Sequence, residues 1–203
     1  MREKQKIRGL RKRRAEIERW ISNSLSLDLD RIKKYQYEYT KIYVYPWSNL
    51  FCNEQPPSDY RNQITSGLID IYMNWRTELE KLDEPYYLKI WLSYPRFMKS
   101  QVVAGIGERI QWYNNVFPPV EEDFAFPISS FTKAEEKISK LNWTPFLDED
   151  TFFESDVEYT ESQKFINRIR EKHDKKIIID GEDGEDICYT KTRGIVWCGS
   201  LGG

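Results

Sequence analysis

Carboxylates are the side chains of this sequence whose number and spacing could do chemistry, and they gather near the C-terminus. Five acids and two glycines make up the stretch from Asp180 to Asp186. A metal-dependent nuclease needs carboxylates that converge on a cation from neighbouring strands, and Asp180 with Glu185 or Asp186 imitates this across a hairpin. The imitation is incomplete, because the usual carboxylate, spacer and lysine are missing at Tyr189–Lys191, and the run departs from a calcium-binding loop. We therefore predict no metal ion and no cofactor, and a metal-dependent nuclease-like enzyme is the third of three hypotheses.

The histidine and cysteine content excludes the common nucleophilic mechanisms within this chain. His173 is the only histidine, so a Ser-His-Asp, Cys-His-Asn or multi-histidine metal site would need residues from another chain. The three cysteines, Cys52, Cys188 and Cys198, form no Cys-x-x-Cys pair, and an odd number argues against a secreted disulfide framework. The sequence thus predicts no catalytic residue, buried or idle thiols at Cys52 and Cys198, and a cytoplasmic location.

Charge is unevenly distributed along the chain, although the net charge is only −2. Seven acids and no base lie between Asp148 and Glu161. A field of one sign steers an oppositely charged protein toward it, so the acidic half predicts a basic partner. The residues predicted to bind that partner are Asp148, Glu149, Asp150, Asp180, Glu182, Asp183, Glu185 and Asp186.

The basic N-terminus supports a different hypothesis, which is nucleic-acid binding. Eight Lys or Arg residues and a single Glu lie between Met1 and Arg14, and clustered cations release counterions from phosphates. The competing interpretation is a solvated helix face that pairs with the chain's own acids, and a pI near 5.7 favours it, because nucleic-acid-binding domains are basic throughout. The candidates for nucleic-acid contact are Arg8, Arg11, Lys12, Arg13 and Arg14.

Periodicity in the centre of the chain predicts the elements that position these charges. Residues from Tyr86 to Tyr94 alternate as in a half-buried strand, and the apolar run from Gln101 to Gly107 predicts an adjacent strand of the same sheet. Ahead of them, apolar residues recur every three or four positions and predict a long amphipathic helix from about 58 to 83, with Ser58 as its N-cap. The apolar stripe consists of Tyr60, Ile64, Leu68, Ile71, Trp75, Leu79 and Leu82.

Weaker patterns predict the remaining elements. Alternating tyrosines predict a strand from Tyr35 to Tyr45, and a capping-box spacing predicts a short helix from Thr132 to Leu141. The acidic segment from Asp148 to Glu161 has the composition of a wet loop or an interaction segment. Two strands around the acidic turn form a C-terminal β-hairpin, and the residues from Ile195 to Cys198 are expected to add a further strand.

Together these elements predict a single α+β domain over residues 1–203. Its mixed or antiparallel sheet is covered by the long amphipathic helix, and a chain of 203 residues buries such a core without metal or disulfides. The predicted parts are a basic N-terminal helix (1–30), a helix-and-sheet core (35–120) and an acidic C-terminal half (121–203). No apolar run is long enough to span a bilayer, and the N-terminus lacks the core of a signal peptide, so no membrane partner is expected.

Several of these segments resemble a known bacterial family. They are Lys6–Leu10, Phe51–Asn53, Leu68–Asp70, Tyr87–Pro95 and Ser100–Val103. Over about the first 120 residues the chain resembles the family catalogued as domain of unknown function 3916, and this resemblance implies no catalytic motif. Cytosolic bacterial proteins of this build are often immunity proteins that bury the active site of a toxin. By that analogy of class, the first hypothesis is a cytoplasmic protein-binding protein, an immunity or antitoxin-type inhibitor of a basic partner such as a toxin domain.

Overall fold

The structure is a computed structural model, and it describes residues 10–30, 40–44, 55–106, 124–153, 167, 171, 175–181 and 184–201. Its helices are α1 (Leu10–Ser24), α3 (Ser58–Leu79) and α4 (Glu135–Ile138), with short 3-10 helices at Phe97–Lys99, Ile128–Ser130 and Thr132–Ala134. Its strands are β1 (Thr40–Val44), β2 (Tyr86–Tyr94), β3 (Gln101–Ile106), β4 (Asn142–Phe153), β5 (Lys175–Gly181) and β6 (Gly184–Ser200). The α+β class predicted from the sequence is confirmed. None of the described helices combines the length and the apolar character needed to cross a bilayer.

The N-cap residue of helix α3 is one residue earlier than the sequence predicted. Pro57 is the N-cap residue, no side chain caps the helix, and Ser58 is already helical. The Pro57 carbonyl accepts hydrogen bonds from the backbone N–H groups of Tyr60 and Arg61 at 3.0 Å. The predicted cap at Ser58 is therefore wrong, because the backbone itself satisfies donors of the first turn.

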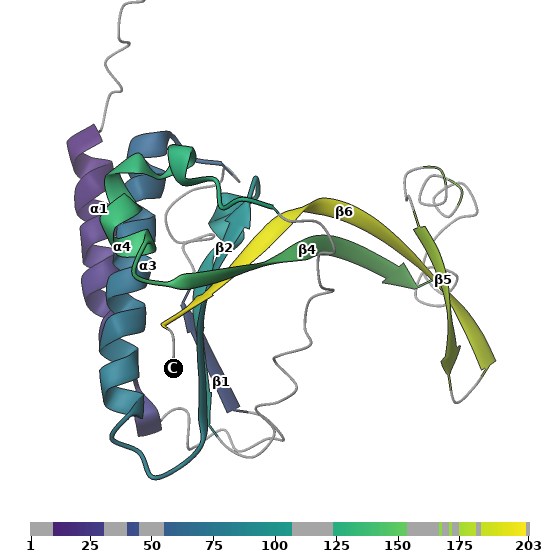
Figure 1. Ribbon diagram of the computed structural model, residues 1–203, viewed down its shortest axis with the longest axis horizontal. Helices are drawn as coiled ribbons and strands as arrows, with labels where there is room; N and C mark the ends of the chain where they lie inside the picture. Colours follow the sequence, from purple (N-terminus) through teal and green to yellow (C-terminus); the bar gives the residue numbers. More distant parts are fainter. Residues whose placement is uncertain are drawn as a thin grey trace, which may run out of the picture.

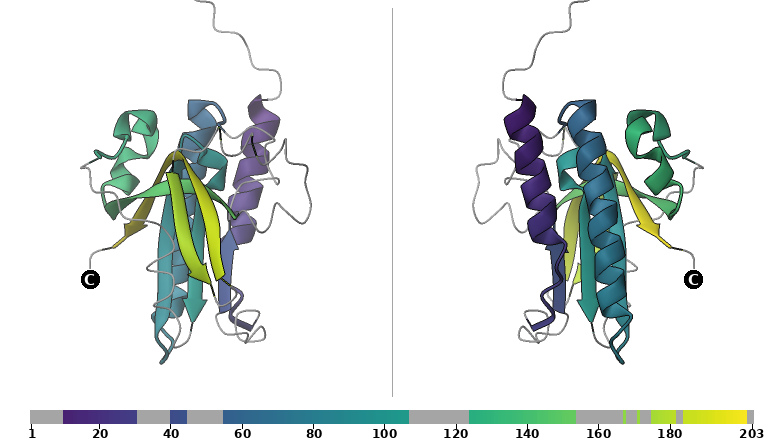
Figure 2. Two further views of the ribbon diagram at one scale, coloured as in Figure 1. Left: turned by 90° about the vertical axis from the view of Figure 1, so that its right-hand side faces the viewer. Right: turned by 90° about the vertical axis from the view of Figure 1, so that its left-hand side faces the viewer.

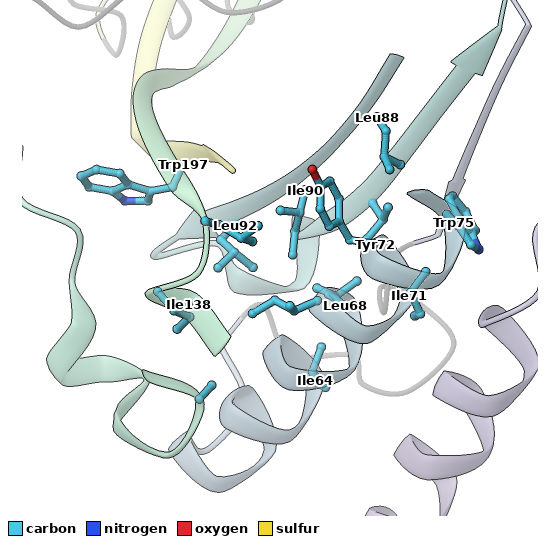
Figure 3. Packing of buried hydrophobic residues seen from close by; sticks show 14 of the residues in the cluster. Ile64, Leu68, Ile71, Tyr72, Trp75, Leu88, Ile90, Leu92, Ile138 and Trp197 are labelled. Atoms are coloured by element: carbon cyan, nitrogen blue, oxygen red, sulfur yellow. The ribbon is translucent and has the colours of Figure 1, made fainter. Parts of the chain in front are cut away.

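The apolar side of α3 packs on the sheet. Leu68 and Ile71 of α3 are fully buried in one core cluster with Ile90 and Leu92 of β2, and Leu68 faces these two residues (Figure 3). The three described helices lie together on this side of the sheet (Figures 1 and 2). Burial of each such side chain stabilises the fold by about 1.5–3 kcal/mol, so this half of the sheet holds the main core.

Strands β2 and β3 are neighbours in the sheet, as predicted. The structure shows that they pair antiparallel, from Tyr86 opposite Ile106 to Trp91 opposite Gln101. The prediction that β2 is half-buried is wrong. On the face turned away from the core cluster, Tyr87 and Trp91 are also buried and form a second apolar cluster with neighbouring strands. The reason is that aromatic residues carry enough apolar area to build a core on both faces of one strand.

All strand pairs in the sheet are antiparallel, with the order β1-β3-β2-β6-β4, and β5 also pairs with β6. The C-terminal hairpin of β5 and β6 is confirmed. Two other expectations need correction. The separate strand predicted from Ile195 to Cys198 is the end of the 17-residue β6, and the predicted acidic loop is strand β4 as far as Phe153. Pairing with β6 along the whole of β4 supplies backbone hydrogen bonds that override the weak strand propensity of its acids.

The helix predicted from Thr132 to Leu141 is shorter than expected, because a 3-10 turn precedes α4. Side chains of α3 hold this segment in place. The Asn62 Oδ1 atom accepts a hydrogen bond from the backbone N–H of Lys133 at 3.0 Å, and Lys137 Nζ lies 2.6 Å from Asp70 Oδ1. Residues 35–39 of the predicted tyrosine strand lie outside the described residues, and β1 covers the remainder as far as Val44.

The far parts of β4 and β6 run on past β2 and carry β5 at their end (Figure 1). We call this extension the arm, and it comprises residues 149–153, 175–181 and 184–193. Figure 2 shows it on the side of the sheet away from α1 and α3. The arm therefore holds the acidic hairpin away from the helix-covered core.

Candidate functional site

Three of the five acids predicted in the C-terminal turn lie on the arm. Asp180 is the last residue but one of β5, and Glu185 and Asp186 are the second and third residues of β6. The register places Asp180 directly opposite Glu185. Glu182 and Asp183 lie outside the described residues. The hairpin thus concentrates acidic residues at the far end of the arm, two of them at opposed positions.

The other three predicted partner-binding acids, Asp148, Glu149 and Asp150, lie on β4 where its register with β6 shifts. Asp148 is opposite Gly194, whereas Glu149 is opposite Thr192. The residue between them on β6, Arg193, has no partner position on β4 and is the extra residue of a β-bulge. A bulge bends the strand and increases its local twist, so these acids mark the bend from which the arm departs.

Two of these acids are engaged by arginines of the same chain. Asp150 Oδ2 accepts a hydrogen bond from Arg193 Nε at 2.6 Å, and Asp150 Oδ1 accepts one from Arg96 Nη1 at 3.1 Å. The same Arg96 nitrogen lies 3.8 Å from Asp148 Oδ2, and Asp148 is only 6% exposed. Asp148 is therefore buried beside Arg96, and Asp150, with 25% of its side chain exposed, is paired with both arginines, unlike the free acidic surface that the sequence suggested.

A glycine explains how Arg96 reaches β4. A Cβ atom at Gly194 would lie 2.2 Å from the Tyr94 carbonyl oxygen and 2.7 Å from Pro95 Cδ. Without that atom, the turn after β2 closes directly over β6. Arg96, two residues beyond Tyr94, then extends across β6 to the carboxylates on the next strand. Gly194 is thus required at this crossing for reasons of space.

The arginines control the ionisation of Asp150. Burial disfavours its charged form, but hydrogen bonds from Arg193 and Arg96 outweigh this effect and lower the pKa of the carboxyl group below its ordinary value. The buried Oδ2 atom of Asp148 has no hydrogen-bond donor among the described residues. Glu149 is less constrained, because its Oε1 atom accepts only a long hydrogen bond of 3.4 Å from Thr192 among the contacts of the described chain.

The basic residues predicted for nucleic-acid contact lie on α1, apart from Arg8, which is outside the described residues. Arg11 and Lys12 are exposed. Arg13 Nη1 lies 2.8 Å from Glu16 Oε2, and Arg14 Nη2 lies 3.6 Å from Asp59 Oδ2. The first turns of α1 therefore combine exposed cations with cations that pair with acids of this chain.

Sequence reasoning missed a groove beside this basic surface. It has a volume of about 440 Å³ and is lined by residues of α1, α3 and the 3-10 helix at Thr132–Ala134. Lys133 Nζ lies 2.6 Å from Asp59 Oδ1 at its rim, and Arg14 contacts the same carboxylate. Cations and acids both line it, and Arg14 and Lys133 pair with the same Asp59 carboxylate, so the groove does not define a ligand class. No sequence signal marks it, since its walls come from segments that are distant in the chain.

Cys198 is the cysteine whose side chain the structure describes, and its thiol is not activated. Burial raises the pKa of the Cys198 thiol to about 12, with a weaker opposing effect of Lys89, so this cysteine is protonated at neutral pH. It is a part-buried thiol, as predicted. His173 and Cys52 lie outside the described residues. Within the described ranges, no three His, Cys, Asp or Glu side chains come together as metal ligands.

In comparisons with known proteins, no family model, no curated protein and no solved structure matches the chain. The resemblance of the first 120 or so residues to a bacterial family therefore stays a prediction, and the geometry of the chain itself is what bears on its function.

Proposed function

We propose that this chain is a cytoplasmic bacterial binding protein of the immunity or antitoxin type, which inhibits a basic protein such as a toxin domain. In this proposal, the acidic hairpin of the arm is held against cationic side chains of the partner. The observation that carries the proposal is the register of the hairpin, which opposes Asp180 and Glu185 at the far end of the arm (Figure 1).

The opposed acids of the hairpin are unfavourable for the free chain. Like charges at directly opposed positions destabilise a pair of strands by about 0.2–1 kcal/mol, and an isolated two-stranded hairpin is marginally stable at best. Locally unfavourable choices of this kind are expected at functional sites. A cationic partner removes the repulsion on binding and is also steered toward the acids from a distance.

The shape of the arm suits entry into a cleft. β5 has seven residues, and a strand rises about 3.3 Å per residue, so the hairpin reaches about 20 Å. Its end is narrow, since pairing of β6 with β4 stops at Cys188 and, among the described strands, Ile178–Gly181 pair with Gly184–Ile187 alone. An inhibitor built in this way occupies the substrate path of a basic enzyme and leaves its own helix-covered core outside the cleft.

The test compares two variants that each lose three negative charges. D180N/E185Q/D186N changes the hairpin, and E18Q/E135Q/E136Q changes exposed acids on the helices. The wild-type chain and the helix variant should capture the same basic protein from a lysate of the source cell, and the hairpin variant should bind that purified protein at least ten-fold more weakly. Affinity should fall steeply with added salt.

The functional half of the test is protection. Cells that express the captured protein should grow when the wild-type chain is co-expressed and stop growing when the hairpin variant replaces it. The proposal fails if no specific basic protein is captured, or if the hairpin variant binds and protects as well as the wild type.

Nucleic-acid binding by α1 remains the second candidate, and the exposure of Arg11 and Lys12 is the observation that favours it. Neutralising both residues should then weaken binding to a mixed-sequence DNA or RNA duplex and reduce the slope of affinity against salt. Absence of any duplex binding by the wild-type chain at low salt would end this candidate.

A further inference from the structure

The arm joins the core of the sheet through a short stretch in which two strands run without a third. Pairing of β6 with β2 ends where Ile195 is opposite Tyr94, and pairing with β5 begins where Thr190 is opposite Lys175. Between these points, residues 191–194 of β6 pair with β4 alone among the described strands. We call this stretch, with residues 148–150 of β4, the neck.

The neck has the properties of a mechanical weak point. Two-stranded ribbons twist more than wider sheets and are marginally stable alone. The bulge at Arg193 interrupts the ladder in the middle of the neck, and an interrupted ladder bends more easily. Backbone pairing by itself therefore leaves the angle between the arm and the core weakly determined.

Side chains span this weak point. We call Arg96, Asp148, Asp150 and Arg193 the brace. Asp148 lies on the core side of the bulge and Asp150 on the arm side, and Arg96, which belongs to the turn after β2, contacts both. Arg193, the bulged residue, holds Asp150 from the other side. The brace thus links the core, the bulge and the arm through one carboxylate.

The brace is sheltered enough to matter energetically. The side chains of Arg96 and Asp148 are 18% and 9% exposed, and pairs shielded from solvent are screened less by salt than surface pairs. The 3.8 Å separation of Arg96 Nη1 from Asp148 Oδ2 leaves this buried oxygen without a hydrogen bond from the described residues. A rotation of the arm would move Asp150 relative to Arg96 and change their 3.1 Å contact, so the energy of the brace depends on the angle of the arm.

We propose that the neck is a hinge and that Arg96 is the positioning residue that locks the arm, with its acidic hairpin, at a fixed angle to the core. The purpose of this lock rests on the proposed function, because a fixed hairpin loses less conformational entropy when it binds. The lock itself is a property of the free chain and is tested without a partner.

The test is hydrogen–deuterium exchange of the full chain, followed peptide by peptide. R96Q removes the guanidinium from the neck. R76Q is the matched control, because Arg76 of α3 pairs with Glu80, the C-cap residue of that helix. R96Q should raise exchange at least ten-fold in β5 and in residues 184–190 of β6, with β2 and β3 unchanged, because local opening of the arm is then less opposed. R76Q should leave the arm at wild-type rates, and R96K should restore part of the protection.

R96Q leaves Asp148 as a buried charge without its arginine, which is costly to the whole fold. If R96Q does not fold, R96Q/D148N removes both charges and is measured in its place. The hinge inference is overturned if arm exchange in the folded variant equals that of the wild type, or if β2 and β3 exchange rises as much as the arm, since Arg96 would then stabilise the whole fold.

Binding separates the hinge from the proposed function. With the partner captured as described above, R96Q should bind several-fold more weakly although every acid of the hairpin is retained. Unchanged arm exchange together with lost binding in D180N/E185Q/D186N would overturn the hinge and leave the proposed function standing. If arm exchange rises in R96Q but the wild-type chain captures no basic partner, the hinge stands and the proposed function is overturned.

Discussion

The helix-covered half of the sheet and the arm are held by different forces. Leu68, Ile90 and Val102 are fully buried in the first region, where α3 packs on β2 and β3. The arm leaves that apolar cluster behind at the neck, where ion pairs of Arg96 and Arg193 with Asp150 take over. Apolar burial thus dominates in the helix-covered half. Ion pairs join the arm to it at the neck, and Tyr189 of the arm is itself buried.

This division has a physical logic. Hydrophobic burial is strong but has no direction, so it stabilises a core without fixing the angle of a ribbon outside it. Charge-assisted hydrogen bonds are directional, and they are shorter and stronger than neutral ones. A bent two-strand connection is therefore held best by a few arginine–carboxylate contacts, and such contacts respond to salt and pH, unlike the core.

The largest expected effect lies in the helix-covered half. L68A should lower the free energy of unfolding by about 2–5 kcal/mol, because it leaves a cavity at a fully buried position. M73A, on the same helix but 40% exposed, is the control and should change it by less than about 1 kcal/mol. Urea unfolding followed by tryptophan fluorescence measures both. Equal losses in the two variants would contradict the assignment of the main core to this face.

An intermediate effect is expected at the crossing over β6. G194A places a Cβ atom 2.2 Å from the Tyr94 carbonyl oxygen, and displacing backbone should cost about 1–3 kcal/mol. G67A is the control, because its Cβ atom would meet Ile21 Cδ1 at 2.3 Å and Cγ1 at 2.4 Å, which are atoms of a side chain that can change rotamer, whereas G194A meets backbone. The gain in helix propensity, about 1 kcal/mol, offsets that adjustment. The same unfolding titration applies, and a larger loss in G67A than in G194A would refute the prediction.

The smallest expected effect is the contribution of Asp150 to stability, which depends on pH. The pKa of Asp150 is lowered in the folded state from its ordinary 3.8, so its ionisation contributes stability above that pH, and the contribution is lost as pH falls through the lower folded-state pKa. D150N should therefore cost about 1 kcal/mol at pH 7, and its difference from the wild type should shrink below about pH 4. Urea titrations from pH 7 to pH 2.5 measure this, and a difference that does not depend on pH would contradict it.

The central elements were predictable because their signals are local. The helix expected from about 58 to 83 runs from Ser58 to Leu79, and the two neighbouring strands pair as expected. In each of these elements apolar residues recur at a regular spacing, every three or four positions in the helix and every second position in a strand, and this is visible within a short window of sequence. The predicted N-cap was wrong because the Pro57 carbonyl, and not a side chain, accepts the first hydrogen bonds of α3. The predicted half-buried strand was wrong because Trp91 and its neighbours form an apolar cluster on the second face of β2.

The candidate site was predicted only in part. The acids of the hairpin turn were identified from composition, whereas the fate of Asp148 and Asp150 was not. Their partner Arg96 is about 50 residues away in sequence, and no periodicity connects the two segments. The strand character of β4 was also missed, because its acids are poor strand formers and only its pairing with β6 makes a strand of them.

By itself, the sequence determined the α+β class, the central helix and strand pair, and the separation of acidic from basic segments, since each depends on neighbours within a few residues. The tertiary structure decided the length of β6, the bulge at Arg193 and the capture of two acids by Arg96. Those features depend on which strands meet and on the space left by Gly194, and contacts between residues distant in the chain cannot be read from local pattern.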